Sequence, residues 1–175
     1  MRVITVPEVI VFNLRINILW LYRQRNNCIS INYIKRGNKM ANNICVEMVN
    51  FTPTMRCNLK CKLCGVLVPH YSYCPQMTVD EFEKSLEAMF QVVDYVRKLQ
   101  ITGGEPFMHP QLPELIKKCF QYEKQFDKVW ILTNGTIPPK PELLEAISQH
   151  KDRLLVHISD YGLKKENTEK LVREL

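Results

Sequence analysis

The chain has 175 residues, of which 46% are hydrophobic and 24% are charged, and its formal net charge is +6. This length suits one well-buried domain and is too short for two ordinary ones, and the composition is that of a folded globular protein. Asn13, Arg15 and Asn17 interrupt the apolar stretch 9–21, and no small-residue cleavage site follows it. These features argue against a signal peptide and against a membrane span of about 20 apolar residues.

The net charge belongs to the N-terminal segment. Residues 1–39 contain seven Lys and Arg and a single acid, Glu8, whereas the bases and acids of the remaining chain balance. Residues 12–18 alternate like a half-buried strand, although apolar residues within 10–21 could equally form a helical stripe. Residues 35–43 have the glycine and asparagine content of a linker. We therefore divide the chain into a basic N-terminal extension and linker, residues 1–43, and a core domain, residues 44–175.

The basic extension has two interpretations. We favour a solvated or loosely docked segment that is dispensable for the chemistry of the core. The alternative is contact with phosphate or with an anionic membrane surface. No pattern in the chain indicates a specific nucleic-acid partner.

Strand and helix signals alternate four times after Ile44. Thr78 and Glu81 form a predicted capping box, and from there apolar residues recur at helical spacing from Phe82 to Val93 and Val96. Further helices are predicted at 112–124, 141–149 and 165–175, and strands at 44–51, 98–102, 128–133 and 153–159. This order predicts an α/β fold with a parallel sheet.

Polar clusters follow each predicted strand. They are a loop with three cysteines, then Gly-Gly-Glu-Pro at 103–106, Thr-Asn-Gly at 133–135, and Ser-Asp-Tyr-Gly at 159–162. The carboxyl ends of parallel strands meet at the edge of the sheet where such folds bind their ligands. We therefore expect the four clusters to share one active site.

The cysteine loop has the residue types of a metal site. Cys57, Cys61 and Cys64 place three thiols within eight residues, and thiolates suit both iron–sulfur clusters and zinc. Three ligands to a four-iron cluster leave one iron open to the amine and carboxylate of a small molecule. The alternative is a structural zinc with Cys74 or His70 as the fourth ligand. Without a signal peptide, clustered cysteines indicate a reducing, cytoplasmic setting.

The second cluster adds a feature that suits a cofactor. Gly103 and Gly104 let the backbone approach a ligand closely, and Glu105 offers a negative charge to a ligand ammonium. The C-x3-C-x2-C spacing, followed by Gly-Gly-Glu-Pro and then Leu-Thr-Asn-Gly, resembles the radical S-adenosylmethionine (radical SAM) superfamily. The resemblance extends from Ile44 to about Gly162.

That resemblance implies a partial (βα) barrel of the radical SAM type, here with about four βα units. It implies that Cys57, Cys61 and Cys64 hold a [4Fe–4S] cluster, and that residues 103–105 line the methionine end of S-adenosylmethionine. It places Asn134 and Ser159 near the cofactor's ribose and carboxylate. The cofactor-binding residues are thus Gly103, Gly104, Glu105, Asn134 and Ser159.

The implied reaction is reductive cleavage of S-adenosylmethionine to a 5′-deoxyadenosyl radical, which abstracts hydrogen from an unknown substrate. An external flavodoxin- or ferredoxin-like protein would supply the electron. No residue is assigned a catalytic role, and Asp160 and Tyr161 are candidates for substrate contact. The alternative function is a non-catalytic iron–sulfur electron-transfer module or a structural zinc module.

The sequence departs from the superfamily at its C-terminus. The superfamily's barrel has six strand–helix units, whereas this chain ends within the fourth helix. We therefore expect a truncated member in which the cofactor pocket and substrate site are incomplete.

Overall fold

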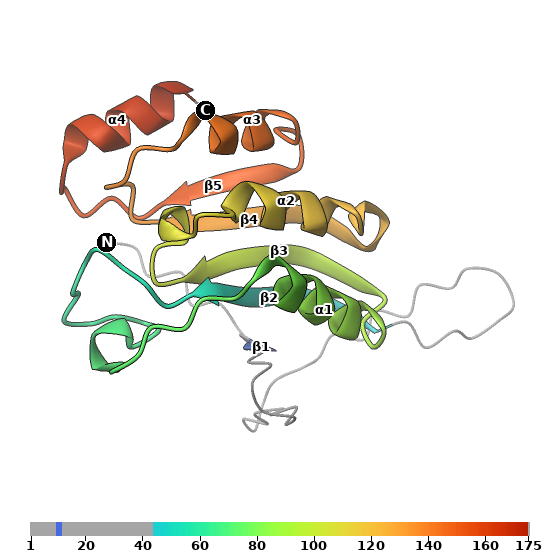
Figure 1. The fold of residues 1–175 in the computed structure, drawn as a ribbon. Coiled ribbons are helices and arrows are strands. Elements are labelled where there is room, and N and C mark those ends of the chain that lie inside the picture. Colours follow the sequence, from blue (N-terminus) through green and yellow to red (C-terminus); the bar gives the residue numbers. More distant parts are fainter. Residues whose placement is uncertain (1–9, 12–43, 175) are drawn as a thin grey trace, which may run out of the picture.

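A computed structural model describes residues 10–11 and 44–174 of the chain. Its centre is one parallel sheet in which neighbours along the chain are also neighbours in space, in the order β1-β2-β3-β4-β5 (Figure 1). The strands are β1 (Ile10–Val11), β2 (Cys45–Thr54), β3 (Tyr95–Gly103), β4 (Phe126–Thr133) and β5 (Leu154–Ile158). The predicted α/β fold with a parallel sheet is confirmed.

A helix follows each of the four long strands. The helices are α1 (Val79–Phe90), α2 (Leu112–Phe120), α3 (Pro141–Ser148) and α4 (Lys165–Glu174), with short 3-10 turns at Val68–His70, Pro106–Met108 and Glu123–Gln125. Figure 1 shows α1 and α2 in front of the sheet, and α3 and α4 at the end where β5 lies. The four repeated strand–helix units are those of a partial (βα) barrel.

The hydrophobic core lies between the sheet and these helices. Alternate strand residues such as Val49, Leu99 and Ile131 are completely buried, and helix residues such as Phe82 and Leu115 pack against them. Phe51 and Phe82 meet edge to face with their ring centroids 5.2 Å apart. The strand β3 lies at the centre of this core, because it pairs with β2 on one side and with β4 on the other.

The first helix begins where the sequence predicts and ends earlier. Thr78 and Glu81 form the capping box: each residue's side chain accepts a hydrogen bond from the other's backbone N–H. The expected continuation through Val93 and Val96 is wrong. The helix ends at Phe90. Val93 lies in the segment that follows, where its backbone N–H donates to the carbonyl of Met89, and Val96 lies in β3. Both valines are buried, because they continue the apolar face in a different backbone conformation.

The strand β1 was not predicted. Ile10 and Val11 pair in parallel with Val49 and Asn50 of β2, so the N-terminal extension contributes a short strand to the sheet. Two residues are too short for a periodic signal. Residues 12–18, for which strand and helix were both open, and the linker expected at 35–43 lie outside the described residues. No helix in the described part of the chain has the length and hydropathy to cross a membrane.

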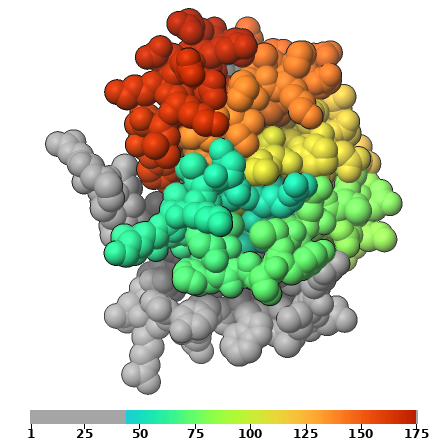
Figure 2. Space-filling view, turned by 60° about the vertical axis from the view of Figure 1, so that its left-hand side comes forward, coloured from blue at the N-terminus to red at the C-terminus, as the bar shows by residue number. Residues whose placement is uncertain are grey.

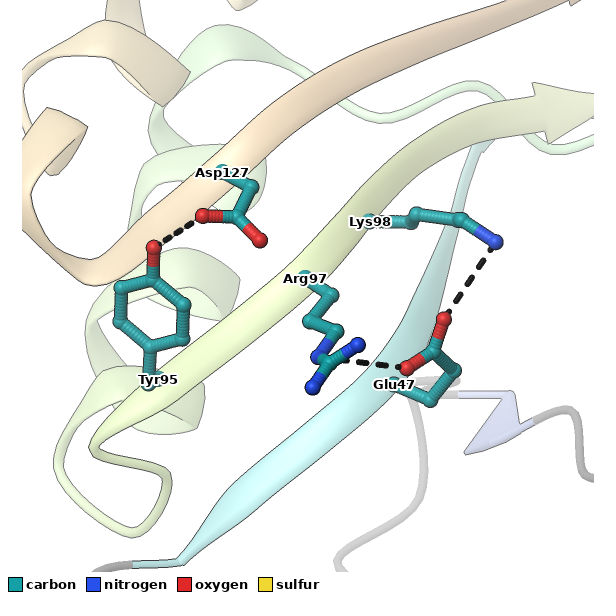
Figure 3. Close-up of polar contacts among 5 residues, drawn as sticks. All are labelled: Glu47, Tyr95, Arg97, Lys98 and Asp127. Carbon is teal, nitrogen blue, oxygen red and sulfur yellow. Dashed lines mark hydrogen bonds and ion pairs between the residues drawn. The ribbon is translucent and has the colours of Figure 1, made fainter. Parts of the chain in front are cut away.

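Charged and polar pairs join the amino-terminal ends of the strands. Glu47 of β2 lies 3.5 Å from Arg97 and 3.3 Å from Lys98 of β3, and the Tyr95 hydroxyl donates to Asp127 of β4 (Figure 3). Exposed ion pairs of this kind contribute little to stability. They mark the edge of the sheet opposite the one where the predicted polar clusters lie.

Leu99→Ala tests the assignment of β3 to the centre of the core. Leu99 is completely buried, so we expect the free energy of unfolding in urea to fall by about 2–5 kcal/mol through lost burial and a residual cavity. Leu155→Ala on β5 is the control, because that side chain is 40% exposed. Equal effects of the two substitutions would contradict the assignment.

Candidate functional site

The backbones that follow β2 and β3 approach each other closely. The N–H of Gly104 donates to the carbonyl of Thr54 at 2.9 Å, and the N–H of Glu105 donates to the carbonyl of Arg56 at 2.7 Å. A Cβ at Gly104 would lie 2.1 Å from the Arg56 oxygen, and one at Gly103, whose φ is +122°, would lie 2.3 Å from the Thr54 oxygen. Both glycines are therefore required for the approach of the segment that leads into the cysteine loop.

The cysteine loop is closed at its base by backbone contacts. The N–H of Met55 donates to the carbonyl of Pro75 at 2.9 Å, and the N–H of Met77 donates to the carbonyl of Pro53 at 2.7 Å. The loop between these contacts lies at the surface, beside the C-terminal segment (Figure 2). The backbone on both sides of the loop is thereby tied to the end of β2.

The three thiols are half-buried and free. Burial raises the pKa of the Cys57 thiol, and the nearby Glu105, Cys61 and Cys64 add to this, whereas the N–H of Leu59, 3.4 Å from the sulfur, opposes it. A thiolate at this position therefore needs a positive partner, which a metal supplies. Three thiolates fit an iron–sulfur cluster, in which each cysteine binds its own iron.

A structural zinc site would need its ligands gathered around one metal ion, whereas an iron–sulfur cluster spreads them over several irons. Among the described residues, no three His, Cys, Asp or Glu side chains lie close enough together to hold one metal ion. Cys74 is exposed, and so is His70 at the end of the short turn Val68–His70.

Glu105 is completely buried and joins the end of β3 to the end of β4. Its Oε1 accepts hydrogen bonds from the N–H of Phe107 (3.0 Å) and the hydroxyl of Thr133 (2.7 Å), and its Oε2 accepts from the N–H of Asn134 (2.8 Å). Burial raises the pKa of Glu105, and these three donors oppose the shift. The carboxylate therefore points into the protein, toward the neighbouring strand end.

The predicted site residues at β4 and β5 reach the same edge. The side-chain amide nitrogen of Asn134 lies 4.0 Å from the Cys57 sulfur and 3.0 Å from the Asn58 oxygen. The N–H of Ser159 donates to the carbonyl of Thr133 at 2.8 Å, one strand further along the sheet. The structure thus joins Cys57, Glu105 and Asn134 through direct contacts and places Ser159 beside them.

Asp160 and Tyr161, the candidates for substrate contact, lie beyond this group. Both are exposed, and the Asp160 carboxylate accepts from the N–H of Gly162 in its own turn. Sequence reasoning missed Asn58 and Thr136, whose side chains both bond to Asn134. Thr133 belongs to the predicted Thr-Asn-Gly cluster, but its hydrogen bond to Glu105 was not foreseen.

The chain belongs to the radical SAM superfamily, because the model of that family matches residues 51–172. This is a superfamily of enzymes whose cofactors are a [4Fe–4S] cluster and S-adenosylmethionine. The matched range includes all the predicted site residues.

Individual relatives support the same assignment. The chain is 37% identical over 109 residues to the antilisterial bacteriocin subtilosin biosynthesis protein AlbA of Bacillus subtilis, covering 62% of this chain and 23% of AlbA. It is 30% identical over 132 residues to GTP 3′,8-cyclase of Aliarcobacter butzleri, covering 74% of this chain and 39% of the cyclase.

A solved structure confirms the fold. Streptococcus suis SuiB, solved with its precursor peptide SuiA and also with S-adenosylmethionine, matches with a TM-score of 0.50. In the peptide complex the identity is 22%, and the match covers 66% of this chain and 24% of SuiB. The chain thus spans between about a quarter and two fifths of the lengths of these relatives.

Gly104→Ala tests the close approach of the two backbones. The added Cβ has no room beside the Arg56 carbonyl, so we expect a loss of about 1–3 kcal/mol in the free energy of unfolding, as in overpacked cores. Gly65→Ala is the matched control within the cysteine loop, because a Cβ there meets nothing within 4 Å. A Gly104→Ala variant as stable as the control would contradict this packing.

Glu105→Gln tests the buried carboxylate. A glutamine has one oxygen and one NH2 group, so one of the three donors would face another donor, and we expect a loss of about 1–3 kcal/mol in urea unfolding. Glu142→Gln on the exposed first turn of α3 is the control. Unchanged stability, combined with weaker binding of S-adenosylmethionine, would instead show that the carboxylate meets the ligand.

Proposed function

We propose that this chain carries part of a radical SAM enzyme core that cleaves S-adenosylmethionine reductively to start hydrogen abstraction. The observation that supports this most directly is the 2.7 Å hydrogen bond from the N–H of Glu105 to the carbonyl of Arg56. Arg56 immediately precedes Cys57. The bond therefore holds the Gly-Gly-Glu-Pro motif next to the first thiol of the cysteine loop.

Cys57, Cys61 and Cys64 are the proposed cluster ligands. A cluster held by three cysteines has one iron open to the amine and carboxylate of S-adenosylmethionine. Held by these three residues and reduced, the cluster would supply the electron for cleavage of the cofactor's carbon–sulfur bond, which is the source of the 5′-deoxyadenosyl radical. In this proposal the loop holds the three thiolates at the carboxyl edge of the sheet, where β2 ends.

The proposed cofactor-binding residues are Gly103, Gly104, Glu105, Asn134 and Ser159. Since the Glu105 carboxylate is buried and bonded on both oxygens, we propose that it positions the segment, while the backbone of Gly103 and Gly104 faces the methionine end. Asn134 and Ser159 follow β4 and β5 and would lie beside the ribose and carboxylate. All five come from the carboxyl edge of the sheet, where parallel α/β folds bind ligands.

The proposed function covers cleavage of S-adenosylmethionine and hydrogen abstraction, and it names no substrate. AlbA is a bacteriocin biosynthesis protein, SuiB is solved with a precursor peptide, and the cyclase is named for GTP, so the substrate differs among them. The electron would come from a flavodoxin- or ferredoxin-like protein. All six described cysteines are free thiols, which suits a reducing compartment such as the cytoplasm.

The two alternative functions, an electron-transfer module and a structural zinc module, do not require the Gly-Gly-Glu-Pro motif beside the cysteine loop. An electron-transfer module needs the three thiols but not the motif at 103–106 beside them. A structural zinc needs a fourth ligand, for which Cys74 and His70 are the candidates in the loop. The placement of Glu105 and Asn134 against Cys57 favours the enzyme.

Anaerobic reconstitution with iron and sulfide tests the cluster. We expect about four irons per chain, as a [4Fe–4S] cluster requires, and a clear loss of iron in Cys57→Ala, Cys61→Ala and Cys64→Ala. Cys74→Ala is the control, because that thiol is outside the motif and exposed. Stoichiometric zinc that depends on Cys74 would contradict the proposal.

A further inference from the structure

Three side chains form a closed ring of hydrogen bonds beside the cysteine loop. The amide nitrogen of Asn134 donates to the oxygen of Asn58 at 3.0 Å, and the amide nitrogen of Asn58 donates to the hydroxyl oxygen of Thr136 at 2.7 Å. The Thr136 hydroxyl donates in turn to the oxygen of Asn134 at 2.6 Å. Each member of the ring is both a donor and an acceptor, so the three bonds strengthen one another.

The ring determines which way the Asn134 amide faces. Its oxygen accepts two hydrogen bonds from Thr136, one from the hydroxyl and one from the backbone N–H at 2.9 Å. The opposite orientation would point the NH2 group at that backbone N–H, donor against donor. The amide nitrogen is therefore held on the side of Asn58 and the cysteine loop.

Buried contacts hold the ring on the protein side. The backbone N–H of Asn134 donates to the buried Glu105 carboxylate at 2.8 Å. Thr136 is 1% exposed, and its carbonyl accepts from the side chain of Asn167 in α4 at 2.8 Å. The ring therefore joins the cysteine loop, the end of β4 and the start of α4 into one unit.

One proton of the Asn134 amide is left for Cys57. The nitrogen has two protons, of which one goes to Asn58, and the Cys57 sulfur lies 4.0 Å away. Resting on the proposed function, we propose that Asn134 is a positioning residue whose amide donates to the Cys57 sulfur and raises the reduction potential of the cluster. Asn58 and Thr136 hold the amide in place for this purpose.

The physical reason is the charge that reduction adds. Hydrogen bonds to the sulfurs of an iron–sulfur cluster are among the factors that set its potential, together with net charge and solvent exposure. A donor aimed at Cys57 stabilises the more negative, reduced state more than the oxidised state. Its loss therefore makes the cluster harder to reduce.

The test is the midpoint potential of the reconstituted full chain, followed by electron paramagnetic resonance without S-adenosylmethionine. Omitting the cofactor separates this effect from any contact of Asn134 with the ribose. Asn134→Leu has a similar size and no donor, and we expect a more negative potential than in the unaltered chain. Thr136→Val removes the hydroxyl from the ring and should shift the potential in the same direction by a smaller amount.

Two control variants distinguish an effect on the reduction potential from a loss of stability. Thr136→Ser retains the hydroxyl and should keep the potential of the unaltered chain. Asn167→Ala removes a neighbouring bond to Thr136 outside the ring, and should also leave the potential unchanged. Losses of stability alone would appear in unfolding curves and not in the potential.

An unaltered potential in Asn134→Leu would overturn the proposal. If that variant fails to retain a cluster, Thr136→Val decides, and an unaltered potential there would overturn it equally. Failure of the unaltered chain to bind any cluster would contradict the proposed function itself, which is a separate outcome.

Discussion

The close approach of the backbones at 54–56 and 103–105 is the constraint on which the rest of the site depends. Two hydrogen bonds of 2.9 and 2.7 Å extend the pairing of β2 and β3 beyond the strands, and only glycine leaves room for them at 103 and 104. The residue before Cys57 is one partner in this contact. The cysteine loop therefore cannot move at its start without moving the Gly-Gly-Glu-Pro motif.

Polar contacts carry this constraint across the sheet. The buried carboxylate of Glu105 reaches Thr133 and Asn134 at the end of β4, and three donors offset the cost of burying it. The side chain of Asn134 then returns to the cysteine loop through Asn58. A site held in this way on strand ends is more accurate than one built on a free loop, which suits a reaction that needs two cofactors in contact.

The sequence predicted much of the fold because strand and helix periodicities are local. The capping box at Thr78 and the order of the four strand–helix units are confirmed. The helix end was wrong, because Val93 and Val96 continue an apolar spacing that helix and strand can both satisfy. The side chains of Asn58 and Thr136 were missed as partners of Asn134, because Asn58 and Asn134, for example, are 76 residues apart and meet only in the folded sheet.

The electron paramagnetic resonance signal of the reduced, reconstituted chain, recorded with and without S-adenosylmethionine, tests the central claim most directly. If the loop holds a cluster with one open iron beside the segment 103–105, the added cofactor binds that iron and changes the signal. A cluster signal that stays the same at saturating cofactor would contradict the account. It would show that the three cysteines belong to an electron-transfer module.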